Sequence, residues 1–339
     1  MKKKTIIEPK NKNLGIELLR FILCLWIVII HCSKVEKKHQ KYFFKGFHVP
    51  TFFMLSFYFY YPILYLKKID KITSRFQRLY FPYLLWPIFI LILNNCMIKL
   101  TSLGQYQKKL LLKDYYIQIL TGSRYHRVFW FQFNLIFLSL FIAIISFIFR
   151  NKLLPLLEIL GVISLYIHFS GINKNFFGSF SGCFQMSLGN LIEMIPLATI
   201  GCIFSSLNLL QNIRNIPLYR RLLLLLMIIL LFKYDLFIRF NGFFYPHVLL
   251  NIVSSIHLFI LFGSSNLFKI SKINTIINFI TKFTGGIYYI HPIFPKYVLF
   301  FTNTKRSYFS SLIIYIICYI ICFLGNKKFI QTKFKYLFI

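Results

Sequence analysis

Ten long apolar segments constrain this chain more than any other feature of its sequence. Each is roughly 17 to 25 residues long, the length at which an α-helix crosses the hydrocarbon core of a bilayer. Because every backbone polar group must be satisfied within lipid, such segments are expected to be helical. We therefore predict an all-α integral membrane protein, a bundle of about ten transmembrane helices that forms one domain over residues 1–339 without a further soluble domain. The predicted spans are Leu14–Cys32, Phe47–Leu66, Leu79–Ile98, Val128–Phe149, Leu153–Ser170, Cys183–Phe204, Leu222–Ile238, Phe243–Gly263, Phe283–Phe301 and Tyr308–Gly325.

The composition supports a lipid environment and excludes a soluble multi-domain architecture. Hydrophobic residues make up 58% of the chain and charged residues only 14%, against roughly 25% charged residues in an ordinary soluble protein. The formal net charge of +32 would by itself suggest a nucleic-acid partner. The lysines and arginines, however, lie between the apolar blocks and form no single basic face. The expected partner is therefore the lipid bilayer, and no nucleic acid is expected.

The distribution of basic residues predicts how the chain is oriented. Cytoplasmic loops of membrane proteins carry an excess of lysine and arginine. The strongest clusters, Lys2–Lys4 and Lys67–Arg78, both favour a cytoplasmic N-terminus, and an even number of spans puts the C-terminus on the same side. The five lysines of Lys34–Lys45 fall on the predicted outer side and oppose this orientation. On balance we predict a topology with both termini inside.

Neither the cysteines nor any short motif indicates a metal or nucleotide site. The seven cysteines lie inside or at the ends of apolar segments and form no CxxC pair, so neither a disulfide framework nor a zinc site is predicted. The chain has no GxxxxGK, GxGxxG, HExxH or GxSxG sequence. Nucleotide hydrolysis, Rossmann redox chemistry and zinc proteolysis therefore have no support, and we expect no metal cofactor.

Ionisable side chains in the first predicted span are the first candidates for a site. Arg20 and His31 are eleven residues apart, which is about three helical turns, so they lie on one side of the helix, roughly 16 Å apart along its axis. Glu17 precedes Arg20 by three residues and can pair with it. Ionisable groups at membrane depth are costly and indicate function, so one interpretation is an imidazole base with an electrostatic partner. In the alternative, Arg20 reaches the headgroups and His31 lies at the outer interface.

A second candidate pair precedes the third predicted span. Arg75 and Arg78 are three residues apart and can grip a phosphorylated ligand from one helix face, or they are positively charged anchors at the inner surface. Other polar residues within the spans either join helices by hydrogen bonds or line a polar cavity; they are Gln132, Asn134, Glu158, Asn190, Glu193, His247, Asn251, Ser254 and Ser255. We interpret three further histidines as structural: His126, His168 and His257.

Two shorter stretches have the spacing of helices that lie in the membrane interface. The first follows residue 110, where leucines and tyrosines recur within a polar loop, and the second covers residues 273–280, where isoleucines follow helical spacing. The second is expected to lead into the ninth span.

Five stretches together resemble the membrane-bound acyltransferase family 3, which comprises O-acyltransferases of surface polysaccharides and related glycans. Their order and spacing hold across the whole chain, and ten spans fit its length. The stretches are Gly15-Ile-Glu-Leu-Leu-Arg20 continuing to His31, similar to the family's Arg-x10-His; Val49-Pro-Thr-Phe-Phe-Met-Leu-Ser56; Arg75-x-x-Arg78 followed by Leu79-Tyr-Phe-Pro82; Phe129-Trp-Phe131; and Gly286-Ile-Tyr-Tyr-Ile-His-Pro292.

The resemblance implies a function and a role for each candidate residue. The donor would be cytoplasmic acyl-CoA, most often acetyl-CoA, with its phosphates at Arg75 and Arg78. His31 would be the general base that takes the proton from an acceptor hydroxyl, Arg20 would hold or charge-balance the donor, and Glu17 would orient Arg20. The acceptor would be a surface polysaccharide or a lipid-linked glycan. The implied location is a multi-pass position in the cytoplasmic membrane of a bacterium.

Two other functions compete with this one. In a transporter or channel, the charged residues within the spans would form a proton or solute pathway, but the sequence shows no inverted repeats or matched broken helices. A scaffold that has lost activity is the third interpretation, and the intact Arg-x10-His pattern opposes it. The identity of the acceptor, the kind of acyl group and the oligomeric state are left open by the sequence.

Overall fold

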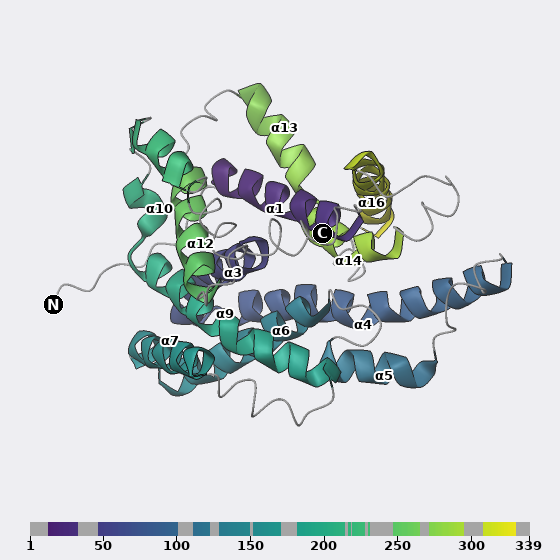
Figure 1. Ribbon diagram of the computed structural model, residues 1–339, viewed down its shortest axis with the longest axis horizontal. Helices are drawn as coiled ribbons and strands as arrows, with labels where there is room; N and C mark the ends of the chain where they lie inside the picture. The colour runs from purple at the N-terminus through teal and green to yellow at the C-terminus, as the bar shows by residue number, and fades with distance from the viewer. Residues whose placement is uncertain are drawn as a thin grey trace.

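The described part of the chain is helical. The computed structural model describes residues 13–32, 47–100, 111–122, 129–149, 152–170, 182–213, 216–217, 219–227, 230, 247–264, 271–294 and 308–329, and no strand occurs among them (Figure 1). The named helices in chain order are α1 (Leu14–Cys32), α3 (His48–Tyr65), α4 (Ile69–Leu100), α5 (Leu112–Thr121), α6 (Phe129–Ile148), α7 (Leu153–Phe169), α9 (Gly182–Ser206), α10 (Leu209–Asn212), α12 (His247–Gly263), α13 (Ser271–Thr281), α14 (Thr284–Ile290), the 3-10 turn η4 (His291–Ile293) and α16 (Tyr308–Phe329).

Five helices of the described part are long and apolar enough to cross a membrane. They cover Leu14–His31, Ile69–Cys96, Phe129–Ile148, Gly189–Ser206 and Ser310–Lys327, and two shorter apolar helices cover Leu153–Phe169 and Leu249–Gly263. α3 coincides with the second predicted span, but four tyrosines and His48 lower its mean hydropathy. Most of the seventh predicted span and the end of the ninth lie outside the described residues. The all-α membrane architecture is therefore confirmed, whereas the number ten stays a prediction.

The third predicted span begins earlier than expected. α4 starts at Ile69, ten residues before Leu79, and its 32 residues extend over about 48 Å at the helical rise per residue. That exceeds the hydrocarbon core of roughly 30 Å, so part of α4 projects beyond it. The predicted span began only at Leu79, because hydropathy reports lipid contact and not helicity. Arg75 and Arg78, predicted to share a helix face just before the span, lie within the same continuous helix as the span.

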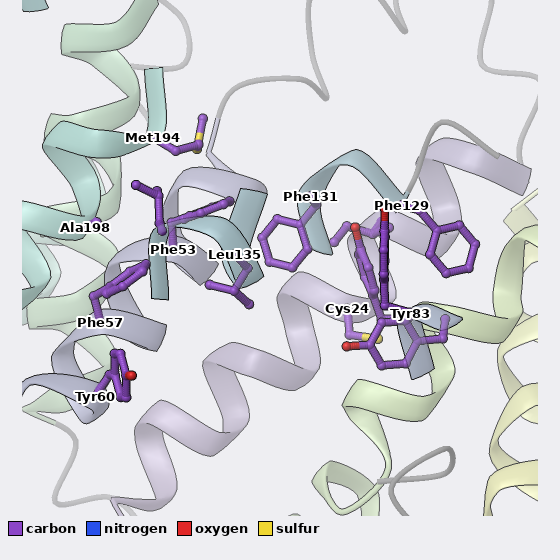
Figure 2. Close-up of a cluster of buried hydrophobic side chains, with 14 of the residues drawn as sticks. Cys24, Phe53, Phe57, Tyr60, Tyr83, Phe129, Phe131, Leu135, Met194 and Ala198 are labelled. Carbon is purple, nitrogen blue, oxygen red and sulfur yellow. The ribbon is translucent and has the colours of Figure 1, made fainter. Parts of the chain in front are cut away.

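The centre of the bundle is α3, which packs against α9, α12, α1 and α6. Close approach to α9 requires a residue without a side chain, because a Cβ on Gly201 would lie 2.3 Å from the carbonyl oxygen of Met54. Small residues at helix interfaces are typical of membrane bundles. Figure 2 shows the aromatic core beside this contact, which extends from Met194 and Ala198 to Phe129 and Tyr83.

α1 packs on the opposite side, against α12, α13, α14 and α16. The thiol of Cys24 donates to the carbonyl of Thr284 at 3.3 Å, and the rings of Phe21 and Tyr315 meet edge to face with centroids 5.7 Å apart. α1 is thus fixed to the C-terminal helices, although more than 250 residues separate them in the chain. Figure 1 shows α13, α14 and α16 gathered beside α1.

Both predicted amphipathic helices are present, as α5 and α13. In α5, Gln118 is buried while Leu112 and Leu120 are exposed, and the hydroxyl of Tyr83 donates to the carbonyl of Ile119 at 2.6 Å. α13 buries Ile277 and exposes Ile276. It ends at Thr281, and α14 begins at Thr284, as the sequence predicted for a helix that leads into the ninth span. That these helices lie in the membrane interface stays a prediction.

Candidate active site

The predicted pair of Arg20 and Glu17 is present on α1. Nη1 of Arg20 lies 3.3 Å from both carboxylate oxygens of Glu17, one helical turn before it. The side chain of Arg20 is 38% exposed and that of Glu17 is 14% exposed. The carboxylate therefore orients the guanidinium, which keeps donors and accessible surface for a further anionic group.

His31 lies in the last turn of α1 and keeps accessible surface. Its ring neighbours that of His291, with centroids 5.4 Å apart and planes tilted by 38°. The regular helix from Leu14 to Cys32 places His31 on the same side as Arg20, as the sequence predicted, at a separation of roughly 16 Å along the axis. The two predicted residues share one helix face but do not touch.

His291 is fully buried at the point where α14 becomes the 3-10 turn η4. Its Nδ1 lies 2.7 Å from the carbonyl oxygen of Tyr288 and 3.3 Å from that of Ile287. A carbonyl oxygen only accepts hydrogen bonds, so Nδ1 must carry the proton, and in a neutral imidazole Nε2 then holds the lone pair. The fold therefore fixes both the position and the tautomer of this ring.

A third histidine, His48, is close enough to His31 for the two to interact electrostatically. It begins α3, is 8% exposed, and its Nδ1 has no hydrogen-bond partner in the described part of the chain. Three histidines from α1, α3 and η4 thus gather at one end of α1. Among the described residues no group of three His, Cys, Asp or Glu side chains is arranged to hold a metal ion.

His48 and His291 were not among the site residues predicted from the sequence. His291 stood inside a quoted stretch, Gly286–Pro292, and His48 directly preceded another, Val49–Ser56. The histidine in or beside each stretch was the only feature of the sequence that could have marked these residues as candidates for the site. What the sequence could not show is that His291 lies beside His31, since 260 residues separate the two in the chain.

Arg75 and Arg78 point to different environments. Nη2 of Arg75 donates to the hydroxyl oxygens of Ser56 at 2.7 Å and Ser139 at 3.2 Å, and its guanidinium lies 4.2 Å from the centre of the Tyr60 ring. Arg75 therefore links α4 to α3 and α6. Arg78 is exposed, and its Nε donates to the carbonyl of Ser74 at 3.3 Å. The guanidinium of Arg75 thus faces the interior of the bundle, whereas Arg78 faces outward. Binding of one phosphate by both arginines stays a prediction.

The other polar residues of the spans mainly join helices. The hydroxyl of Thr51 donates to that of Ser255 at 3.0 Å, which links α3 to α12, and the amide of Gln132 donates to the carbonyl of Leu79 at 2.5 Å, which links α6 to α4. Ser254 and Asn134 are buried, Asn251 and Asn190 are half-buried, and Glu158 is exposed. The side chain of His247 and all of His126 lie outside the described residues.

Two of the histidines interpreted as structural have local partners. His168 on α7 lies 3.7 Å from the carboxylate of Glu193 on α9. Nδ1 of His257 lies 2.7 Å from the carbonyl oxygen of Val253 within α12. Neither contact involves the three histidines at the end of α1.

A family model described as an acyltransferase domain matches residues 13–326. The chain belongs to the acyltransferase 3 family. The match extends from the residue before α1 almost to the end of α16, so it covers every element described above. Neither a search of curated proteins nor a search of solved structures finds a match.

Membership of the acyltransferase 3 family decides between the competing interpretations at a coarse level. It supports a multi-pass membrane acyltransferase in general, and no observation in the described structure favours the transporter or channel. The resemblance inferred from the five stretches is confirmed.

Proposed function

We propose that this protein is a membrane-embedded O-acyltransferase that moves an acyl group, most simply acetyl, from cytoplasmic acyl-CoA to a hydroxyl of a surface polysaccharide or lipid-linked glycan. Family membership supports the transferase class. The observation that carries the finer proposal is His31, an accessible imidazole on the same face of α1 as the Arg20–Glu17 pair and beside a second, buried imidazole.

His31 is the proposed general base. Its neutral imidazole takes the proton of the acceptor hydroxyl while the hydroxyl oxygen attacks the thioester carbonyl. The new C–O bond forms, the C–S bond breaks, and the proton on His31 passes to the leaving thiolate of CoA. A neutral imidazole can both accept a proton and return it, which suits this role.

The arginines are proposed to bind the acyl-CoA. Arg78 is exposed and offers donors to a phosphate at the inner surface, while Arg20 keeps accessible surface nearer the membrane interior. Arg75 holds α4 in place through its hydrogen bonds to Ser56 and Ser139. Its contribution to phosphate binding is therefore mainly the attraction of its positive charge. With the predicted cytoplasmic N-terminus, Arg78 faces the cytoplasm and His31 lies beyond the midplane, where an acceptor on the outer side can reach it.

Radiolabelled acetyl-CoA added to membranes that contain the protein tests this proposal. We expect label to enter the glycan fraction, and we expect His31→Ala to lower the rate by about 10²- to 10⁴-fold, the usual contribution of a general base. Arg20→Ala is expected to raise the KM for acetyl-CoA. His257→Ala, in a histidine bonded within its own helix, is the matched control and should keep the wild-type rate.

The outcome that contradicts the proposal is equally specific. If His31→Ala and Arg20→Ala membranes, with normal amounts of protein, still label the glycan at the wild-type rate, the assignment of these residues is wrong. If wild-type membranes transfer no label, the proposed donor and acceptor are wrong.

A further inference from the structure

The contact between His31 and His291 places a buried, oriented imidazole behind an accessible one. His31 keeps accessible surface, whereas His291 is fully buried among α14 and η4. The two ring centres are 5.4 Å apart. In enzyme sites, a catalytic base is commonly held in one tautomer and orientation by a second group behind it. His291 has that position relative to His31.

The hydrogen bonds of His291 determine what it can offer to His31. Its Nδ1–H is directed at the carbonyl oxygens of Tyr288 and Ile287, at 2.7 and 3.3 Å. The lone pair is consequently on Nε2, and this nitrogen acts as an acceptor. If the ring of His31 turns an N–H toward it, the other nitrogen of His31 is left with its lone pair on the accessible side.

We propose that His291 is a positioning residue for the acyl transfer, which holds His31 in the tautomer and orientation of a base and stabilises its protonated form. This inference rests on the proposed function of His31. In the transfer step, the acceptor hydroxyl gives its proton to His31, the C–O bond forms and the C–S bond breaks. In the imidazolium of His31, the N–H that faces His291 donates toward Nε2 of His291. The proton newly taken up on the accessible nitrogen then passes to the thiolate. His291 itself gains and loses no proton.

The local structure around His291 supports this role. His291 is the first residue of the 3-10 turn, directly after α14 and before Pro292, and the ring of Tyr288 lies beside its ring with centroids 5.9 Å apart. Packing and two backbone acceptors therefore fix the imidazole before any substrate binds. A residue that only filled space at this position would need no polar side chain, since burying an imidazole costs free energy.

Two substitutions separate the positioning role from a purely structural one. His291→Asn keeps a donor where Nδ1 now bonds the Tyr288 carbonyl but has nothing that reaches the position of Nε2. His291→Gln places its amide near the position of Nε2 and gives up the Nδ1 position. We expect His291→Asn to lower kcat by about 10²-fold or more, with the KM for acetyl-CoA changed by less than about threefold, as for an interaction made mainly in the transition state.

His291→Gln is expected to keep kcat within about tenfold of the wild type, because its amide oxygen can accept from His31. His257→Asn is the matched control, since Nδ1 of His257 also bonds a backbone carbonyl but lies in α12; it should leave kcat unchanged. The assay is the transfer of label from acetyl-CoA to membrane glycan, with the amount of folded protein measured by size-exclusion chromatography in detergent.

Each outcome has one meaning. Wild-type kcat in His291→Asn, or a larger loss in His291→Gln than in His291→Asn, overturns the positioning role while His31-dependent transfer by the wild type preserves the proposed function. If the wild type shows no His31-dependent transfer, the proposed function fails and the positioning role fails with it. A loss of kcat in His291→Asn that His291→Gln largely restores supports the proposal.

Discussion

At the residue scale, the two arginines of the Arg75-x-x-Arg78 stretch have separate physical roles. The guanidinium of Arg75 contacts the Tyr60 ring and the hydroxyls of Ser56 and Ser139, and these contacts compensate for its removal from water. Arg78 is exposed, and its Nε donates to the carbonyl of Ser74 within the same helix. The two arginines look equivalent in the sequence, but we expect substitution of Arg75 to affect stability and substitution of Arg78 to affect binding of the donor.

Substitution of each arginine tests this division. Arg75→Lys keeps the charge but loses the planar contact with Tyr60 and part of the fork that reaches both serines, so we expect a loss of stability of about 2 kcal/mol. Arg78→Gln should leave stability unchanged within about 0.5 kcal/mol and should raise the KM for acetyl-CoA. Thermal unfolding of the purified protein in detergent and transfer kinetics measure the two effects. If Arg78→Gln is less stable than Arg75→Lys, the assignment of a structural role to Arg75 and a binding role to Arg78 is wrong.

At the scale of helices, the contact between α3 and α9 depends on small residues. Gly201 allows the backbones to touch, and Ala198 and Cys202 are almost completely buried beside it. Since lipid is as apolar as the side chains, close packing and not hydrophobic burial holds such helices together. This contact positions α3, and with it His48 at its N-terminal end and Ser56 near its middle.

Gly201→Ala should therefore destabilise the protein. The added Cβ would lie 2.3 Å from the Met54 carbonyl oxygen, which belongs to backbone and cannot turn aside. We expect a loss of about 1 to 3 kcal/mol, as for other overpacked sites. Gly161→Ala is the matched control, because its Cβ would meet the Thr199 hydroxyl at 3.3 Å, a contact that a small shift relieves. Thermal unfolding in detergent compares them, and equal stabilities would contradict the argument.

At the scale of the whole molecule, the direction in which the bundle crosses the membrane decides which substrate meets which residue. The proposed route needs Arg78 on the cytoplasmic side and His31 toward the outer side. Five helices of the described part have the length and composition of spans, and two more are shorter and apolar. The basic clusters of the sequence predict a cytoplasmic N-terminus and, with an even number of spans, a cytoplasmic C-terminus.

Reporter fusions test this topology. A reporter that is active only in the cytoplasm should be active when joined to either end of the chain, because ten spans return it to the side where it began. Alkaline phosphatase, which is active only outside, provides the reciprocal measurement at the same two positions. Opposite locations of the two ends would show an odd number of spans and would contradict the predicted architecture.

Much of the fold was predictable because it depends on local properties of the chain. Hydropathy located α1, α3, α6, α7, α9, α12 and α16 to within a few residues, and spacing located α5 and α13. The start of α4 was not predictable by the same means, because its first ten residues are polar yet helical. In the site, the pairing of Arg20 with Glu17 followed from their spacing, whereas the roles suggested for Arg75 and Arg78 had to be separated once their surroundings were known.

By itself the sequence determined that this chain is a helical membrane protein of the acyltransferase 3 family and that Glu17, Arg20 and His31 share one helix face. Those properties follow from apolar length and from helical periodicity, which act over a few turns of chain. Only the tertiary structure decided that Arg75 faces inward and that His291 lies beside His31, 260 residues away in the chain. Such contacts arise from the packing of whole helices, in which small residues such as Gly201 set the distance of approach, and no local pattern of residues encodes which faces will meet.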